Sequence, residues 1–197
     1  MFTLKFALSH FFHQRKAKNR HGLHSPFVYR LVDEVIYDFS NKKVYAHIEK
    51  TLGSGKKLNS TDKLLYRIAA DNNPQTIWIL GKNEPTDQAI LQQACTNVQF
   101  KKLDNIVDWK DLTPPGVVFL DVQRNPQSAL DYFNKLLPKV NPNMVLIIKN
   151  IPENALTKTS WSIMTSHQKV TASVNLFWIG LMYFRPGQVK EDFLIKF

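Results

Sequence analysis

Cysteine is almost absent from this 197-residue chain, which carries Cys95 alone. One cysteine can form neither an internal disulfide nor a multi-cysteine zinc site, and this scarcity fits a reducing compartment. We therefore expect a cytoplasmic protein. No histidine or acid near Cys95 in sequence would activate its thiol, so we expect a buried apolar residue rather than a nucleophile.

Long hydrophobic runs are also missing. Residues 1–12 are rich in Phe and Leu, but Lys5 and His10 interrupt them, and the stretch is too short to cross a bilayer. No small-residue cleavage site follows, so we expect neither a membrane-spanning helix nor a signal peptide. Four basic residues come next: Arg15, Lys16, Lys18 and Arg20. This order fits a segment lying on a membrane surface. We favour an extension that packs its aromatic side chains on the domain and exposes its lysines, because no clean apolar face is evident.

Acidic residues are scarce, with 16 Asp and Glu against 26 Lys and Arg, for a formal net charge of +10. Such a balance favours anionic partners such as nucleic acid, an anionic membrane surface or an acidic small molecule. No nucleic-acid-binding motif accompanies it, so a solvated basic surface is the simpler explanation. With 44% hydrophobic residues the chain can form a full core. We expect an N-terminal helical extension over residues 1–58 and an α/β domain over residues 59–197.

Two short strings invite a binding interpretation. His21 and His24 have metal-ligand character, but no third ligand is evident, and a structured turn is the better interpretation. Ser25 and Pro26 then form a typical helix start. Residues 53–57 resemble a phosphate-binding loop but lack its leading glycine and its final Ser or Thr, so we expect a plain turn. Ser60 or Thr61 is expected to cap the helix that follows.

The fold class follows from continuous apolar runs. Thr76–Leu80, Val117–Asp121 and Met144–Ile148 read as strands buried on both faces and separated by helical segments, which is typical of a parallel sheet. Val170–Leu176 and Ile179–Phe184 are joined so tightly that they must be antiparallel. The sequence therefore predicts an α/β, Rossmann-like, doubly wound sheet, mostly parallel, with an antiparallel C-terminal hairpin.

Polar residues follow these strands where such sheets bind ligands, beyond the carboxyl ends of the strands. Gly81 ends the first strand, Asp121 the second apolar run, and Lys149 and Asn150 the third. The βαβ connection places Asp121 beside Lys149 and Asn150 at one rim.

The strings Arg20–Val28 and Leu176–Arg185, with Phe193–Phe197 at the end, carry a resemblance to class I S-adenosylmethionine-dependent methyltransferases, in particular a bacterial O-methyltransferase-like group. The resemblance implies S-adenosylmethionine as cofactor, bound at a glycine-rich loop of which only Gly81 matches. It also implies an acid that binds the ribose, for which Asp104 is the candidate. The chain between Gly81 and Asp121 is too short for two complete strand–helix units, so we expect a sheet shortened in the middle.

The resemblance extends to metal-dependent O-methyltransferases, which hold a divalent cation with an Asp and a later Asp-Asn pair. Asp121 matches the first ligand and Asn150 the last, but Lys149 stands at the middle position. A lysine supplies a fixed cation where Mg²⁺ needs oxygen donors, so we expect no metal. We expect Lys149 to pair with Asp121. Arg124, near the place of a catalytic lysine, stays protonated and makes a poor general base.

Two functions remain open. The first is an S-adenosylmethionine-dependent methyltransferase acting on an unidentified small acceptor, with Asp121 and Asn150 as catalytic candidates that orient it. The second is a methyltransferase-like protein without cofactor binding that serves as an interaction module through a basic surface. The poor loop, the uncertain ribose acid and Lys149 favour impaired or lost catalysis. Phe177 and Trp178 could form a dimer face, although core positions are the favoured interpretation.

Overall fold

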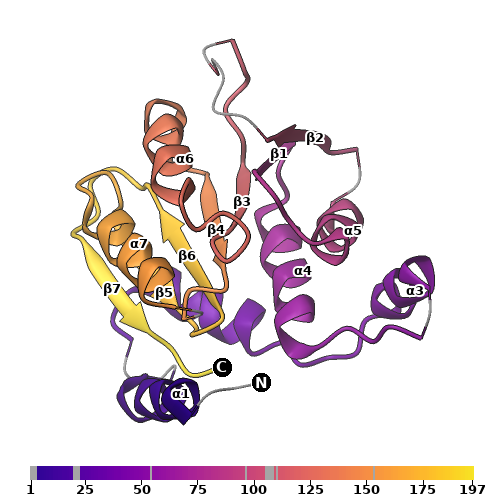
Figure 1. The fold of residues 1–197 in the computed structure, drawn as a ribbon, viewed down its shortest axis with the longest axis horizontal. Helices are drawn as coiled ribbons and strands as arrows, with labels where there is room; N and C mark the ends of the chain where they lie inside the picture. Colours follow the sequence, from indigo (N-terminus) through magenta and orange to yellow (C-terminus); the bar gives the residue numbers. More distant parts are fainter. Residues whose placement is uncertain are drawn as a thin grey trace.

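The chain folds around a single seven-stranded sheet (Figure 1). The computed structural model describes residues 4–19, 23–53, 55–95, 97–104, 109, 111–152 and 154–197. The strands are β1 (Thr76–Leu80), β2 (Gln99–Leu103), β3 (Val117–Asp121), β4 (Val145–Lys149), β5 (Ala172–Asn175), β6 (Ile179–Tyr183) and β7 (Glu191–Leu194). The helices are α1 (Leu4–Lys16), α2 (Pro26–Arg30), the π-helical η2 (Leu31–Ile36), α3 (Lys43–Leu52), α4 (Ser60–Asn72), α5 (Pro85–Ala94), α6 (Ala129–Leu136), the 3-10 helix η3 (Leu137–Lys139) and α7 (Ala155–Ser166).

The sheet has the order β2-β1-β3-β4-β6-β5-β7. Strands β2, β1, β3 and β4 are parallel, and β6 is antiparallel to both β4 and β5. The connection between β5 and β6 is only three residues long, which is far too short for a parallel crossover. The mostly parallel sheet with an antiparallel C-terminal hairpin is confirmed. Strand β7 then returns parallel to β5 at the edge.

Each central strand is buried on both faces, as continuous apolar runs require. Ile77 and Ile79 of β1 face a core built with α2, η2, α3, α4 and α5. Trp78 and Leu80 face a second core built with α6 and α7. This alternation is the period-2 rule of strands, and it places helices on both sides of the sheet. The helices α2, η2 and α3 of the expected extension share the first core.

Helix starts follow local capping chemistry. The backbone N–H of Val28 donates to Ser25 Oγ, and Pro26 begins α2, as expected. The expectation that Ser60 or Thr61 caps α4 is wrong. Asn59 is the N-cap, because its side chain accepts from the N–H of Asp62 while the Asp62 carboxylate accepts from the N–H of Asn59.

The part of the chain between β1 and β3 is short, as predicted, and its described elements are α5 and β2. Strand β2 pairs in parallel with β1, and the described residues between β2 and β3 form no helix or further strand. Trp109, from this connection, lies buried against Trp78 and Tyr132. A single large aromatic side chain thus covers part of the second core there.

Helix α1 lies at the lower edge of the molecule beside the C-terminus (Figure 1). Phe6 packs against Phe177 and Trp178, and the N–H of Lys18 donates to Leu194 O. The expected packing of the N-terminal aromatics is therefore right for Phe6. It is wrong for Phe11 and Phe12, whose side chains are exposed.

Cys95, the histidine turn and the membrane-spanning helix were three further subjects of prediction. Cys95 is buried and its Sγ contacts Ala69 O, and burial raises the pKa of its thiol, so its assignment as a core residue is confirmed. His21 lies outside the described residues, so the histidine turn stays a prediction. No described helix is long and apolar enough to span a bilayer.

Candidate cofactor and acceptor site

Four candidate residues meet at the rim where the parallel strands end. Leu80 of β1 is paired with Leu103 of β2 on one side and with Leu120 of β3 on the other, so the residues after them are neighbours. The N–H of Gly81 donates to Leu103 O at 2.9 Å. Gly81, Asp104, Asp121 and Asn150 therefore lie along one edge, where doubly wound sheets bind their ligands.

Gly81 has a positive φ of 65°, a conformation that favours glycine. A Cβ atom built on Gly81 would lie 2.2 Å from Asn125 Oδ1 and 2.9 Å from a ring carbon of Tyr132. The space left by the missing side chain is thus filled from within the protein. In a cofactor loop, glycine leaves such space for a ligand.

Asn125 ties the loop after β1 to the loop after β3. Its Oδ1 accepts from the N–H of Lys82 at 2.9 Å, and its Nδ2 donates to Lys82 O at 2.7 Å and to Asp121 O at 2.9 Å. An ion pair between Arg124 and Glu84 joins the same two loops. The N–H groups of Gly81 and Lys82 are therefore already bonded inside the protein. The sequence analysis missed this role of Asn125.

Asp121 is fully buried and held by hydrogen bonds. Its carboxylate accepts from Asn150 Nδ2 at 3.0 and 3.1 Å, and from the N–H groups of Gln123 and Arg124. Burial raises the pKa of Asp121, and the Asn150 hydrogen bonds oppose this effect. The two catalytic candidates are thus in direct contact, as their strand-end positions predict.

Lys149 makes a different ion pair from the expected one. Its Nζ lies 2.5 Å from Asp87 Oδ1, whereas Asp121 is bonded by Asn150 and backbone amides, so the expectation that Lys149 pairs with Asp121 is wrong. Asp87 projects from the first turn of α5 and is fully buried. Burial raises the pKa of Asp87 to about 6, against the attraction of the Lys149 ammonium. Sequence analysis missed Asp87, because an acid in a first helical turn is ordinarily solvated.

Asp104, the candidate for the ribose acid, lies at the carboxyl end of β2. It follows β2 directly, its carboxylate lies 3.6 Å from Lys102 Nζ, and its backbone oxygen accepts from the Tyr132 hydroxyl at 2.8 Å. The side chain is exposed. An acid is therefore present at the carboxyl end of the strand beside Gly81.

The residues present do not match a glycine-rich cofactor cradle. Asp104 supplies an exposed carboxylate at the end of β2, but the N–H groups of Gly81 and Lys82 are occupied and Asn125 fills the space beside Gly81. Among the described residues, no group of three or more His, Cys, Asp or Glu could hold a metal ion. A cavity of about 650 Å³ lies at the opposite edge, by the amino ends of the strands at Thr76, Gly116 and Val145.

Solved structures share this fold. A scan against protein-family models gives no match, and a comparison with curated proteins gives none either. An O-methyltransferase described as putative, from Klebsiella pneumoniae, has a TM-score of 0.54 at 9% identity, over 77% of this chain and 94% of that one. The O-methyltransferase TomG from Streptomyces achromogenes, in complex with S-adenosylmethionine, has 0.51 at 13%, over 80% and 95%.

A methyltransferase from Geobacter sulfurreducens gives a TM-score of 0.51 at 14% identity, over 74% of this chain and 90% of that one. At such identities the likeness concerns the fold. The strand order, the helices on both faces and the antiparallel hairpin agree with it. The chain therefore has the fold of the class I S-adenosylmethionine-dependent methyltransferases.

Proposed function

We propose that this chain is a methyltransferase-like protein in which S-adenosylmethionine-dependent catalysis is impaired or lost. The observation that carries the proposal is the side chain of Asn125, which fills the space beside Gly81 and bonds both backbone groups of Lys82. A cofactor whose methionine part approached this loop would have to displace three hydrogen bonds of a buried amide. Leaving buried polar groups unpaired costs about 1 to 3 kcal/mol each.

Lys149 supports the same proposal. In the metal-dependent enzymes that the sequence resembles, its position belongs to a carboxylate ligand. Here Lys149 is a cation that forms an ion pair with Asp87. Lys149 offers no oxygen to Mg²⁺, and the Asp87 carboxylate is already paired. Asp121 and Asn150, which match metal ligands of those enzymes, are instead hydrogen-bonded to each other. If a methyl acceptor still bound, these two residues would orient it.

Calorimetric titration of the purified protein with S-adenosylmethionine and S-adenosylhomocysteine, with and without Mg²⁺, tests the proposal. We expect no saturable heat at two temperatures from a protein whose circular dichroism shows it folded. The matched variant Asn125→Ala empties the space beside Gly81 and frees the N–H of Lys82. If closure by Asn125 is the cause, this variant binds more tightly than the wild type.

Micromolar binding by the wild type, about −8 kcal/mol, would contradict the proposal and identify the loop as functional. The search would then turn to small hydroxyl acceptors. The alternative function, a non-catalytic interaction module with a basic surface, is favoured by the charge of the N-terminal segment, in which residues 1–32 include no Asp or Glu.

A further inference from the structure

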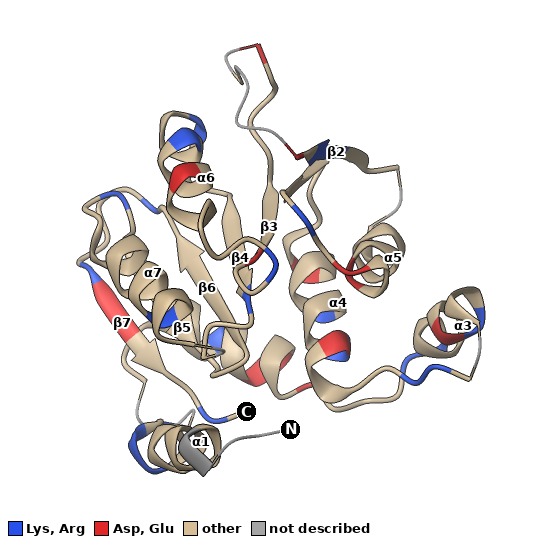
Figure 2. Ribbon diagram, viewed as in Figure 1, with Lys and Arg blue, Asp and Glu red and all other residues tan. Residues whose placement is uncertain are grey.

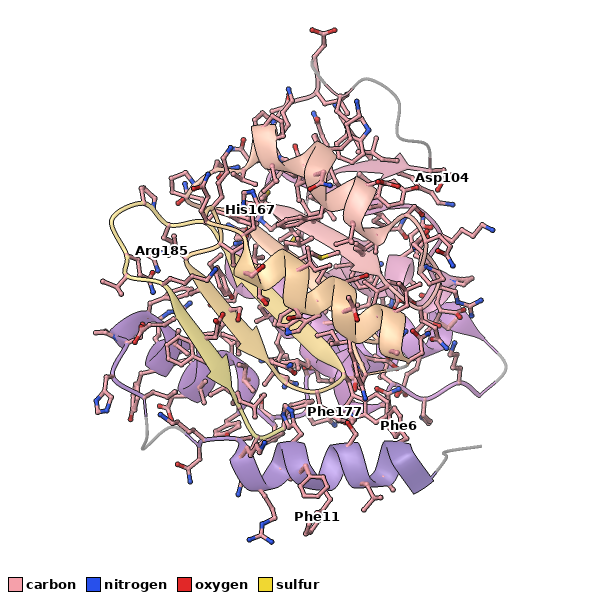
Figure 3. The ribbon with its side chains drawn as sticks, turned by 60° about the vertical axis from the view of Figure 1, so that its left-hand side comes forward. Phe6, Phe11, Asp104, His167, Phe177 and Arg185 are labelled. Atoms are coloured by element: carbon pink, nitrogen blue, oxygen red, sulfur yellow. The ribbon has the colours of Figure 1, made fainter. Side chains whose placement is uncertain are left out.

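In α1 the large apolar and the polar side chains lie on the opposite faces from those expected of a docked helix. The face turned to the domain carries Phe6, His10 and His13 at helical spacing, and Ala17 follows directly after the helix, with His13 and Ala17 buried. The outward face carries Leu8, Phe11 and Phe12, which are 47, 53 and 55% exposed. A docked helix normally buries its large apolar residues and exposes its polar ones. Figure 3 shows Phe6 directed toward Phe177 and Phe11 directed away from the domain.

The inward face is firmly attached, so the exposure of Phe11 and Phe12 is not a consequence of loose packing. The His10 and His13 rings both contact the Phe177 ring, with centroids 4.7 and 5.3 Å apart. His13 Nε2 lies 3.2 Å from Ile195 O, and Gln14 Nε2 donates to Phe197 O. Two polar rings therefore occupy contacts that an apolar residue would ordinarily fill.

Basic residues flank the exposed apolar group. Arg15 and Lys16 continue the outward face by one more turn, and the Arg15 guanidinium lies over the Phe11 ring at 5.8 Å. The first acidic residue of the whole chain is Asp33. Figure 2 shows Lys and Arg but no Asp or Glu on α1. The face is therefore apolar in its middle and cationic at its C-terminal end.

A cleft of about 240 Å³ continues this surface between α1 and α7. Phe12 and Lys16 line it from α1, and Lys158 and Trp161 line it from α7. Lys158 Nζ lies 3.3 Å from Ser9 Oγ, so its ammonium group is held beside α1, and both residues line the cleft. Cationic groups beside an apolar helix face fit the phosphates of lipid headgroups.

We propose that α1 docks the protein on an anionic phospholipid surface, with Leu8, Phe11 and Phe12 inserted at the headgroup boundary and Arg15, Lys16 and Lys158 on the phosphates. Apolar area and cationic charge are the two contributions that bind interfacial helices. A second copy of this chain fits the face poorly, because each copy has a net charge of +10 and would bring the same cations together. Nucleic acid would use the cations but gains nothing from Leu8. The proposal is independent of cofactor binding.

Flotation of the full chain with vesicles tests the proposal. We expect it to float with phosphatidylcholine vesicles containing phosphatidylserine, to stay behind with phosphatidylcholine alone, and to be released by salt. The double variant Phe11→Ser/Phe12→Ser should lower the partition coefficient about tenfold or more, since each ring contributes its apolar area. The control Val189→Ser removes another exposed apolar side chain, 82% exposed between β6 and β7, and should bind as the wild type.

The contribution of the α1 cations to binding is tested with two double variants that change the net charge equally. Arg15→Glu/Lys16→Glu should abolish flotation, whereas Lys50→Glu/Lys135→Glu, with the same change of net charge on α3 and α6, should retain most of it. Circular dichroism and the unfolding temperature verify that every variant is folded. No flotation of the folded wild type would overturn the proposal. So would tighter binding to single-stranded RNA or duplex DNA that depends on Phe11 and Phe12, or a wild-type dimer that the Phe11→Ser/Phe12→Ser variant dissolves.

Discussion

The side chain of Asn125 lies where any residue other than glycine at position 81 would place its Cβ atom. Gly81 and Asn125 are therefore complementary, although they are 44 positions apart in the chain. The pair holds the loop after β1 against the loop after β3, and it fills the space beside Gly81. Under the proposed function, the same contact would both stabilise the fold and hinder cofactor binding.

Replacement of Gly81 by alanine should destabilise the protein strongly. The new Cβ would meet Asn125 Oδ1 at 2.2 Å, and φ would stay at 65°. We expect a loss of about 2 to 4 kcal/mol in the free energy of unfolding. In a double-mutant cycle by urea denaturation, Asn125→Ala should relieve part of the loss, with a coupling above about 0.5 kcal/mol. Additive effects would show that the two residues do not share this space.

The buried carboxyl group of Asp87 should make stability depend on pH. Its pKa is raised from 3.8 to about 6, so the folded state retains a proton that the unfolded state has released. This contribution to stability is complete below pH 3.8 and is lost as pH rises through about 6. Between those values the free energy of unfolding should fall by up to about 1.4 kcal/mol per pH unit from this group.

Asp87→Asn removes that titration and leaves Asp121, whose pKa is also raised, in place. The free energy of unfolding of the wild type minus that of the variant, measured by urea denaturation from pH 4 to pH 7, should therefore fall as pH rises. A constant difference would mean that Asp87 titrates alike in both states. The charge of Asp121 helps to raise the pKa of Asp87, so part of the pH dependence that the variant loses comes from this neighbour.

At the scale of elements, the strands were predictable because burial on both faces forces continuous apolar runs, as in Thr76–Leu80 and Val117–Asp121. Because the carboxyl ends of neighbouring parallel strands lie at one rim, the positions of Asp121 and Asn150 at the ends of two such strands predicted that they are neighbours. The partner of Lys149 was not predictable, because Asp87 is 62 positions away, on a helix whose rotation about its axis decides which residue faces the rim. Likewise the sequence does not distinguish Phe6 from Phe11. Phe6 packs on Phe177, whereas the Phe11 side chain is exposed.

Attachment of α1 should weaken on acidification. His13 packs on Phe177, and burial lowers the pKa of His13 below its usual 6.5, with nearby His10 acting in the same direction. Its contribution to stability is therefore present above pH 6.5 and is lost as pH falls through the lower folded value. Hydrogen exchange of the α1 amides, corrected for intrinsic rates, should show less protection at pH 5 than at pH 7.

The variant His13→Gln keeps a side-chain donor for Ile195 O but cannot titrate in this range. Its α1 protection should vary less with pH than that of the wild type. Equal pH dependence in the two proteins would assign the effect to another group. Protection in β1 and β3 serves as the internal reference, since both strands lie in the centre of the sheet.

At the scale of the whole molecule, the short chain between β1 and β3 leaves β2 as an edge strand, and the two edges of the sheet differ. At one edge, Lys18 bridges to Ile195 just beyond β7, so part of the N-terminal segment covers it. At the other, β2 ends the strand order, and no described strand pairs with its outer side. Five residues of open strand would invite pairing with another chain. Two of those residues are Lys101 and Lys102, so the edge is protected by charge.

Removal of that charge should expose the edge to self-association. Threonine suits a strand and carries no charge, so Lys101→Thr/Lys102→Thr should keep the fold and speed aggregation several-fold on heating. Light scattering during a temperature ramp measures this. The control Lys50→Thr/Lys135→Thr loses two positive charges as well, but from α3 and α6. If both double variants aggregate alike, the cause is the lower net charge of the molecule. If only the first does, the lysines of β2 protect this edge of the sheet from self-association.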